Sequence, residues 1–270
     1  MKKARVLIPI LALEILTPGC AHALKEPPPL QSLGPPLEGG SATKDVDSLL
    51  RQADSLYATR ALPEARKSVA LFLQAARADA SRVEGLLGAA RVLVWLVGHE
   101  PDAASRDKAA TDAVHATQWC QRIDPASSEC DYWLGAAVGV QARERHSTAL
   151  DALPLIEAAF RRAAEKNPSL EEGGPHRALA LLYARAPGWP MGPGDPYRAL
   201  EEARKAVELS PQYPPNQLAL GEALRLTGSP GEAREAYSRA LELARTRLSE
   251  GDRDASEWVR EAQKALAERP

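Results

Sequence analysis

The chain has 270 residues, of which 44% are hydrophobic, 26% are charged and only 5% are aromatic. This composition predicts a globular protein with an ample buried core, and the abundance of Ala, Leu, Arg and Glu favours helices over sheets. Because 34 basic residues are balanced by 36 acidic ones, the formal net charge of -2 excludes a bulk attraction for nucleic acid.

The first residues have the pattern of an export signal. A positively charged start precedes residues 6–13, an apolar run that is too short to span a bilayer, and its charges are Lys2, Lys3 and Arg5. We therefore expect residues 1–19 to be a signal peptide that is removed.

The residues around Cys20 predict where the mature chain is held. The sequence Leu16-Thr-Pro-Gly-Cys20 resembles the lipobox of bacterial lipoproteins, in which the cysteine is cut, lipidated and left as the new N-terminus. This resemblance implies a periplasmic lipoprotein anchored in the outer membrane. Ala21-His-Ala23 offers an alternative, since an A-x-A cleavage site would release a soluble, secreted chain that begins at Leu24. An uncleaved N-terminus in the cytosol is the remaining alternative.

The segment of residues 25–43 is rich in Pro and Gly and shows no hydrophobic period, so we expect it to bury no face. Together with the lipidated cysteine it forms a predicted tether over residues 20–44. In the polyproline conformation, at about 3.1 Å per residue, such a tether would hold the body several tens of Å from a membrane.

Cys120 and Cys130 form an even pair once Cys20 carries lipid, and export permits oxidation. They flank residues 123–126, a turn between two predicted helices, so a disulfide is one interpretation. The other is two small buried thiols at helix contacts.

The clearest repeat spans Pro214 to Arg247. Two amphipathic segments flank the turn Thr227–Pro230, and Ser229 with Glu232 predicts a capping box at the start of the second segment. The small and large residues recur at the offsets of a tetratricopeptide repeat, a helical hairpin that this unit resembles, and they are Leu220, Gly221, Leu224, Ala233, Tyr237 and Ala240.

Four earlier stretches repeat the scheme with longer insertions. In the nearest, the surplus is the Pro- and Gly-rich stretch 186–196, in which Asp195 is predicted to cap the next helix and Pro196 to occupy its first position. The repeat positions are Leu179, Ala180 and Tyr183 with Ala199, Ala203, Ala206 and Pro211; Leu134 and Gly135 with Phe160, Ala163 and Pro168; Leu87 and Gly88 with Ala113, Cys120 and Pro125; and Ala53 and Leu56 with Ala65 and Val69.

The predicted fold is therefore all-α, a right-handed superhelical solenoid of about five irregular tetratricopeptide-like hairpins within a domain over residues 45–270. Residues 254–268 carry their apolar side chains on one stripe, which predicts an amphipathic helix that caps the array.

The signal cysteine, the tether, the irregular repeats and the segment Glu172–Leu200 together resemble the T-component family of TRAP-transporter-associated lipoproteins. That segment has a Gly-Pro-led helix, a Pro-Gly loop and a helix capped by Gly-Asp. The resemblance implies homo-oligomers, namely trimers around a pore, and small hydrophobic or acidic ligands passed to a partner protein.

No catalytic residue, metal site or cofactor is predicted. The five histidines show no i, i+4 pair and no neighbouring ligand at metal-binding spacing. The chain also lacks a Gly-x-Ser-x-Gly elbow and the context of a phosphate loop.

Binding residues are expected on the first helix of each hairpin, which lines the inner groove of tetratricopeptide arrays. Three arginines near one end would suit a carboxylate, whereas a solvated face with weak salt bridges is the alternative. The predicted groove residues are Tyr132, Arg177, Arg185, Glu222 and Arg225.

The loop residues Trp189 and Met191 are a second candidate, because an exposed aromatic on a rigid loop often anchors a partner. The alternative is a Trp that folds back over its hairpin. The hypothesis from sequence is a non-catalytic, envelope-anchored adaptor for a protein or peptide. A small-ligand component of a TRAP-type transporter is the second hypothesis, and a helical hydrolase is the third.

Overall fold

The computed structural model describes residues 24–34 and 45–268. These two stretches contain eleven α-helices, two short 3-10 turns and no β-strand. The helices are α1 (Val46–Tyr57), α2 (Leu62–Ala78), α3 (Glu84–His99), α4 (Ala103–Ile123), α5 (Ser128–Glu144), α6 (Ala149–Lys166), α7 (Leu170–Arg185), α8 (Pro196–Leu209), α9 (Pro214–Leu226), α10 (Pro230–Ser249) and α11 (Ala255–Ala267), with the turns η1 (Leu30–Ser32) and η2 (His146–Thr148).

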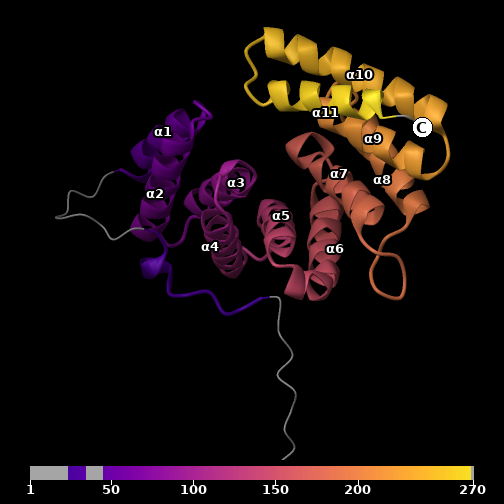
Figure 1. Ribbon diagram of the computed structural model, residues 1–270. Coiled ribbons are helices and arrows are strands. Elements are labelled where there is room, and N and C mark those ends of the chain that lie inside the picture. The colour runs from indigo at the N-terminus through magenta and orange to yellow at the C-terminus, as the bar shows by residue number, and fades with distance from the viewer. Residues whose placement is uncertain (1–23, 35–44, 269–270) are drawn as a thin grey trace, which may run out of the picture.

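The helices pack in consecutive pairs, from α1 with α2 to α9 with α10, and α11 covers the last pair. Figure 1 shows these pairs following one another along an arc. Extensive contacts join neighbours in the sequence, which is the pattern of a solenoid. The predicted fold, a right-handed superhelical solenoid of five hairpins and a capping helix, is confirmed. None of the helices in the described stretches has the length and apolarity needed to cross a bilayer.

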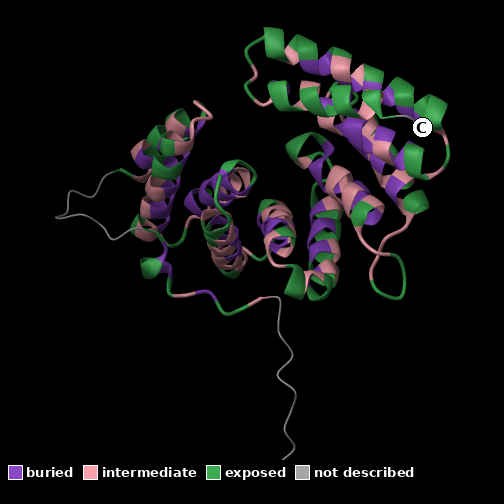
Figure 2. Ribbon diagram, viewed as in Figure 1, coloured by how far each residue is buried: buried purple, intermediate pink, exposed green. Residues whose placement is uncertain are grey.

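In the repeat, a glycine on the first helix of a hairpin packs against an aromatic ring on the second helix. A Cβ on Gly135 would fall 2.8 Å from Phe160, and one on Gly221 would fall 2.5 Å from Tyr237. Only a residue without a Cβ fits at these two crossings, so the offsets seen in the sequence record direct packing. Figure 2 shows the buried residues on the helix faces that meet inside the hairpins.

The helix ends bear out one predicted cap and correct the other. Asp195 accepts hydrogen bonds from the backbone N–H groups of Tyr197 and Arg198. Ser229 makes no side-chain cap, contrary to the predicted capping box. Its N–H donates to Leu224 O at 2.9 Å in a Schellman motif around Gly228, so it is not available to a glutamate.

The insertions expected in the earlier units are mostly not loops. In the second unit the extra residues lengthen α4, which begins at Ala103 and is capped by Asp102 accepting from Ser105 N–H. Extra residues in a helix satisfy their own backbone hydrogen bonds, so the second and third units have longer helices, whereas the extra residues of the fourth unit form the loop between α7 and α8.

The disulfide between Cys120 at the end of α4 and Cys130 at the start of α5 is present, with a Cα–Cα distance of 5.5 Å. Both cysteines are completely buried. Of the two interpretations offered by the sequence, the structure has the bonded one.

Residues 24–34, which we call the strap, differ from the expectation for a tether that buries no face. Pro27, Leu30 and Leu33 are buried, and the two leucines belong to the main core cluster. Because the leucines of this Pro-rich segment follow neither a helical nor a strand spacing, their burial could not be predicted from a hydrophobic period. The signal peptide, Cys20 and residues 35–44 lie outside the described residues.

The two ends of the solenoid are joined by a pair of contacts that we call the clasp. Arg60, in the turn after α1, pairs with both carboxylate oxygens of Asp254 at 2.7 Å. Arg253 donates to Thr59 O at 2.9 Å. The backbone of Arg60 is left-handed, with φ of 53°, and its guanidinium lies 3.9 Å from the centroid of the Tyr57 ring.

Candidate functional site

A hollow of about 510 Å³ lies between α5, α6 and α7, and we call it the apolar groove. Its described lining is apolar apart from two arginines and one histidine. The lining residues are Val94, Gly135, Ala136, Gly139, Val140, Ala142, Arg143, His146, Ala149, Leu150, Leu153, Ile156, Phe160, Ala178, Leu181, Leu182, Arg185, Ala186 and Pro187.

Gly139 leaves the groove open. A Cβ placed on Gly139 would meet no atom within 4 Å, whereas one on Gly135, a turn earlier, would collide with Phe160. Gly135 is therefore required by packing, but Gly139 is not. A glycine inside a helix costs about 0.5 to 1 kcal/mol relative to alanine, so this open position is not explained by the stability of α5.

The basic residues of the groove lie towards one end. Arg143 is in the last turn of α5, His146 begins η2, and Arg185 is the last residue of α7; all three are exposed. Among the described residues that line the groove, none is acidic. An occupant with apolar side chains and a nearby carboxylate would therefore be matched in both respects.

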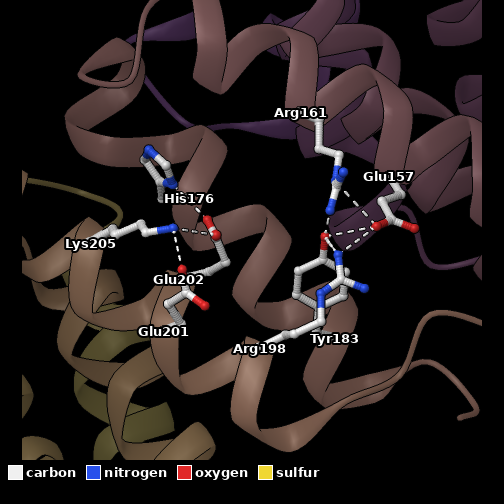
Figure 3. A network of polar contacts seen from close by, with 8 residues as sticks. All are labelled: Glu157, Arg161, His176, Tyr183, Arg198, Glu201, Glu202 and Lys205. Carbon is white, nitrogen blue, oxygen red and sulfur yellow. Dashed lines mark hydrogen bonds and ion pairs between the residues drawn. The ribbon is translucent and has the colours of Figure 1, made fainter.

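A network of charged side chains ties the groove walls α6 and α7 to α8 (Figure 3). The Tyr183 hydroxyl donates to Glu157 Oε1 at 2.9 Å, and Arg198 pairs with the same oxygen at 2.7 Å. Arg161 donates to the Tyr183 hydroxyl at 3.4 Å. Burial alone would raise the pKa of Glu157, but hydrogen bonds from Arg198 and Tyr183 outweigh it, and this pKa is lowered.

The second half of the network joins α7 to α8 nearer the start of α7 (Figure 3). His176 Nδ1 lies 2.6 Å from Glu202 Oε2, and Lys205 pairs with Glu202 at 2.9 Å and with Glu201 at 2.7 Å. The pKa of Glu202 is lowered, because hydrogen bonds from His176 and Lys205 outweigh the opposing effect of burial. These contacts fix α7, which forms one wall of the groove.

The structure brings two predicted groove residues together. Arg185 holds the carboxylate of Glu222 with contacts of 2.7 and 3.0 Å, and this partner raises the pKa of the guanidinium. Arg225 is exposed on α9 and lines a separate small hollow beside Tyr237. Of the three predicted arginines, Arg185 alone lines the apolar groove, and its guanidinium forms an ion pair with Glu222.

Arg177 and Tyr132 have structural contacts instead of an open face. Arg177 donates to Asn216 Oδ1 at 2.9 Å and to Glu171 O at 3.3 Å, and its guanidinium lies 5.0 Å from the centroid of the Tyr213 ring. The ring of Tyr132 packs on Trp133 and Phe160, and burial raises the pKa of its hydroxyl. Arg177 and Arg185 thus already have partners within the chain, and binding of a carboxylate by the three arginines stays a prediction.

The strained start of α7 explains why Arg177 is occupied. Glu171 and Glu172 have φ of 48° and 56°, a left-handed conformation that is costly for glutamate. Arg177 donates to the carbonyls of both residues, and Gly173 continues the turn with φ of 79°. The half-buried Arg177 thus supplies hydrogen-bond donors to the carbonyls of this turn.

The predicted loop anchors are exposed. Trp189 is 90% exposed and Met191 is 64% exposed, so the alternative of a Trp folded back over its hairpin is wrong. The loop itself is held close to α6, since a Cβ on Gly192 would lie 2.9 Å from Leu153. Leu150, which is 53% exposed, lies at the rim of the groove. The loop thus sits beside the groove, and its role in binding stays a prediction.

A second hollow, of about 350 Å³, lies at the other end of the inner face. Its charged lining comprises one arginine, which is paired with Asp54, and four acids; these residues are Arg91, Asp54, Glu84, Glu129 and Glu171. Along α5, the inner face therefore changes from acidic near Glu129 to basic near Arg143.

Sequence reasoning missed the small residues that form the groove. Ala136, Gly139 and Arg143 follow Tyr132 at steps of four, three and four residues, so all of them share one face of α5. That periodicity was the available signal. Among the described residues, no group of three or more His, Cys, Asp or Glu side chains is arranged to hold a metal ion.

No protein-family model matches the chain, and no curated protein matches it. Among solved structures, the chain is similar to TTC0263, described as a thermophilic TPR protein in Thermus thermophilus, with 21% identity, a TM-score of 0.62 and coverage of 82% of this chain and 99% of that one. MamA from Desulfovibrio magneticus RS-1 gives 19% identity, a TM-score of 0.49 and coverage of 76% and 98%. YrrB, described as a TPR protein with an unusual peptide-binding site, gives 17%, 0.44, 74% and 86%. The first of these likenesses shows that the fold is that of a tetratricopeptide-repeat protein.

Proposed function

We propose that the protein is a non-catalytic scaffold that binds a partner protein through the apolar groove. The observation that carries this proposal is the open floor at Gly139, where the helix gives up stability and leaves space that no side chain of the described chain fills. A volume of about 510 Å³ accepts one or two large apolar side chains of a partner segment.

The charges around the groove select the partner segment. Arg143 and His146 are exposed and line the groove, so they are available to carboxylates that flank the apolar anchor. The acidic hollow at the far end of α5 repels such carboxylates. A partner segment therefore lies with its acidic end at Arg143, and this polarity fixes its direction along the inner face.

The test compares Gly139, which lines the groove, with Gly98, which lies outside it; both have open space at the position of a Cβ. A peptide library displayed on phage is panned against the purified protein, and the best peptide is titrated by calorimetry. Gly139→Leu fills the floor and is expected to weaken binding at least about tenfold, since the buried side chain of the partner loses its site. Gly98 on α3 also has no atom within 4 Å of a built Cβ and lies outside the groove, so Gly98→Leu is the matched control.

Equal affinity of both variants would overturn the groove assignment. A peptide that lacks both an apolar residue and an acidic one would overturn its chemistry.

A second candidate function uses the same groove for a small ligand. An apolar lining with cations at one end also suits an apolar carboxylate, as the resemblance to TRAP-transporter T-components implies. Native mass spectrometry of protein from its own host would then show a bound acid of low mass, in trimers. A partner peptide that binds an unliganded monomer would favour the scaffold instead.

We further propose that the scaffold is anchored in the bacterial envelope through lipid on Cys20 and faces the periplasm. The lipobox-like sequence supports this proposal, and the buried disulfide between Cys120 and Cys130 fits an oxidising compartment.

A further inference from the structure

The strap is bound to the body along its whole length. Pro27, Leu30 and Leu33 are buried, and Leu24 packs against the main core cluster. A Cβ on Gly34 would lie 2.8 Å from Leu73 of α2, so the last residue of the strap also touches the body. The two buried leucines are removed from water, and this burial favours the bound position of the strap.

Side chains of α2 and α4 hold the backbone of the strap at three points. Gln118 Nε2 donates to Lys25 O at 2.9 Å, and Trp119 Nε1 donates to Pro28 O at 2.9 Å. Arg77 Nη1 donates to Leu33 O at 2.7 Å. Both ends of the strap are therefore fixed to the outer helices of the first two hairpins.

The Glu26 side chain of the strap forms an ion pair with Arg122, which in turn lies 4.9 Å from the centroid of the Trp119 ring. Proline has little conformational entropy to lose, so a Pro-rich segment is ordered at a small cost. The strap thus behaves as part of the folded body.

This attachment shortens the link to Cys20. Between Cys20 and Leu24 the chain has four peptide steps, which span at most about 14 Å when fully extended. We propose that in the lipidated protein the strap and the C-terminal part of α4 are the surface that lies against the membrane. This inference rests on the proposed acylation of Cys20 but not on the groove.

The chemistry of the surface fits a bilayer of phospholipids. Lys25 is exposed next to the link, where its ammonium group reaches the phosphates of the headgroups. Figure 1 shows the strap along one side of the arc and α10 on the opposite side. The last hairpin therefore points away from the membrane and the first two hairpins lie on it.

The experiment compares two insertions on either side of the strap. The acylated full-length protein is placed in vesicles of phosphatidylethanolamine and phosphatidylglycerol that carry a quencher on the headgroup. A fluorophore is attached at Ala126→Cys, just after the end of α4, or at Ser238→Cys in α10, both exposed positions. The native cysteines do not interfere, since Cys20 is acylated and Cys120 is bonded to Cys130.

A flexible ten-residue Gly-Ser segment is inserted either after Ala23 or after Gly39. It adds about 17 Å of root-mean-square length. We expect the label at residue 126 to be quenched strongly in the parent protein, about half as much with the insertion after Ala23, and as in the parent with the insertion after Gly39, because the bound strap keeps the body in place. The label at residue 238 is expected to be quenched weakly throughout.

Equal effects of the two insertions would show that residues 24–34 act as a loose tether, and this result would overturn the proposal. Equal quenching of the two labels would overturn it as well. Intact mass spectrometry of each preparation checks the link itself. A mature chain without an acyl group on Cys20 would end this proposal, but it would leave the groove and its peptide assay untouched.

Discussion

Asn216 is the residue on which the strained start of α7 depends. It is completely buried on α9, and its Nδ2 donates to Glu172 O and Ala206 O at 2.9 Å and to Ser210 O at 3.1 Å. Its Oδ1 accepts from Arg177. One side chain thus satisfies three carbonyls, one in the strained turn at the start of α7 and two at the end of α8.

Asn216→Ala is expected to lower the free energy of unfolding by about 2 to 3 kcal/mol, because buried carbonyls and the Arg177 guanidinium lose their partner. Urea denaturation followed by circular dichroism measures the change. Gln217→Ala is the control, since Gln217 makes one hydrogen bond, to Pro211 O at 3.2 Å, and is expected to cost less than about 1 kcal/mol. A loss for Asn216→Ala no larger than the control would contradict this role.

At the residue scale, the glycines that pack against aromatic rings can be predicted from the sequence, but Gly139, which borders the empty groove, cannot. Gly135 and Gly221 each stand at a fixed offset from an aromatic residue, so the repeat pattern reveals them. Gly139 has no partner, and a residue that faces empty space leaves no complementary residue elsewhere in the chain. The local pattern places Arg177 in the groove because it does not contain Asn216, the hydrogen-bond partner of Arg177, which lies on another hairpin.

At the scale of elements, the charged network makes the joint between α6, α7 and α8 sensitive to acid. The pKa values of Glu157 and Glu202 are lowered in the folded protein from the ordinary value of 4.5. A carboxyl group with a lowered pKa contributes stability above its unfolded pKa, and that contribution is lost as the pH falls through the folded pKa.

We therefore expect the free energy of unfolding to fall as the pH is lowered below about 4.5, and to fall less steeply in the double variant Glu157→Gln/Glu202→Gln. Urea titrations between about pH 3 and pH 6 give both slopes. Glu201→Gln, which changes an exposed carboxylate paired only with Lys205, should keep the parent slope. Identical slopes for the parent and the double variant would contradict the assignment.

The hairpins themselves were predictable because each is specified by local contacts. Helix caps, turns and the glycine–aromatic offsets all fall within one unit of about 34 residues. Where a prediction at this scale was wrong, two local sequence signals competed for the same backbone group. Ser229 has the sequence of a capping box, but its N–H is used by the Schellman motif that ends α9.

At the scale of the whole molecule, the clasp joins residues that are 194 positions apart. No local pattern contains such a contact, and the docking of the strap on α4 is also distant in sequence, with 91 positions between Pro28 and Trp119. The sequence therefore predicts an open array with a free tether, whereas the structure has an array with joined ends and a bound strap.

Asp254→Ala is expected to separate the ends and to raise the radius of gyration measured by small-angle X-ray scattering. The change in stability should be small, about 1 kcal/mol or less, because the pair is partly exposed and Asp254 makes no side-chain cap for α11. Glu250→Ala, at a nearby exposed position, is the control. A radius unchanged within error in Asp254→Ala would contradict the role of the clasp.

The clasp also changes how the array frays. In an open repeat array the terminal units have one neighbour each, so they unfold locally before the middle does. Here α1 and α11 meet through Arg60 and Asp254, so each terminal unit has a second neighbour. Salt screens the ion pair that holds this second neighbour. The protection of amide protons in α1 and α11 against hydrogen exchange should therefore decrease as the ionic strength rises. The protection of α5, in the middle of the array, should not change.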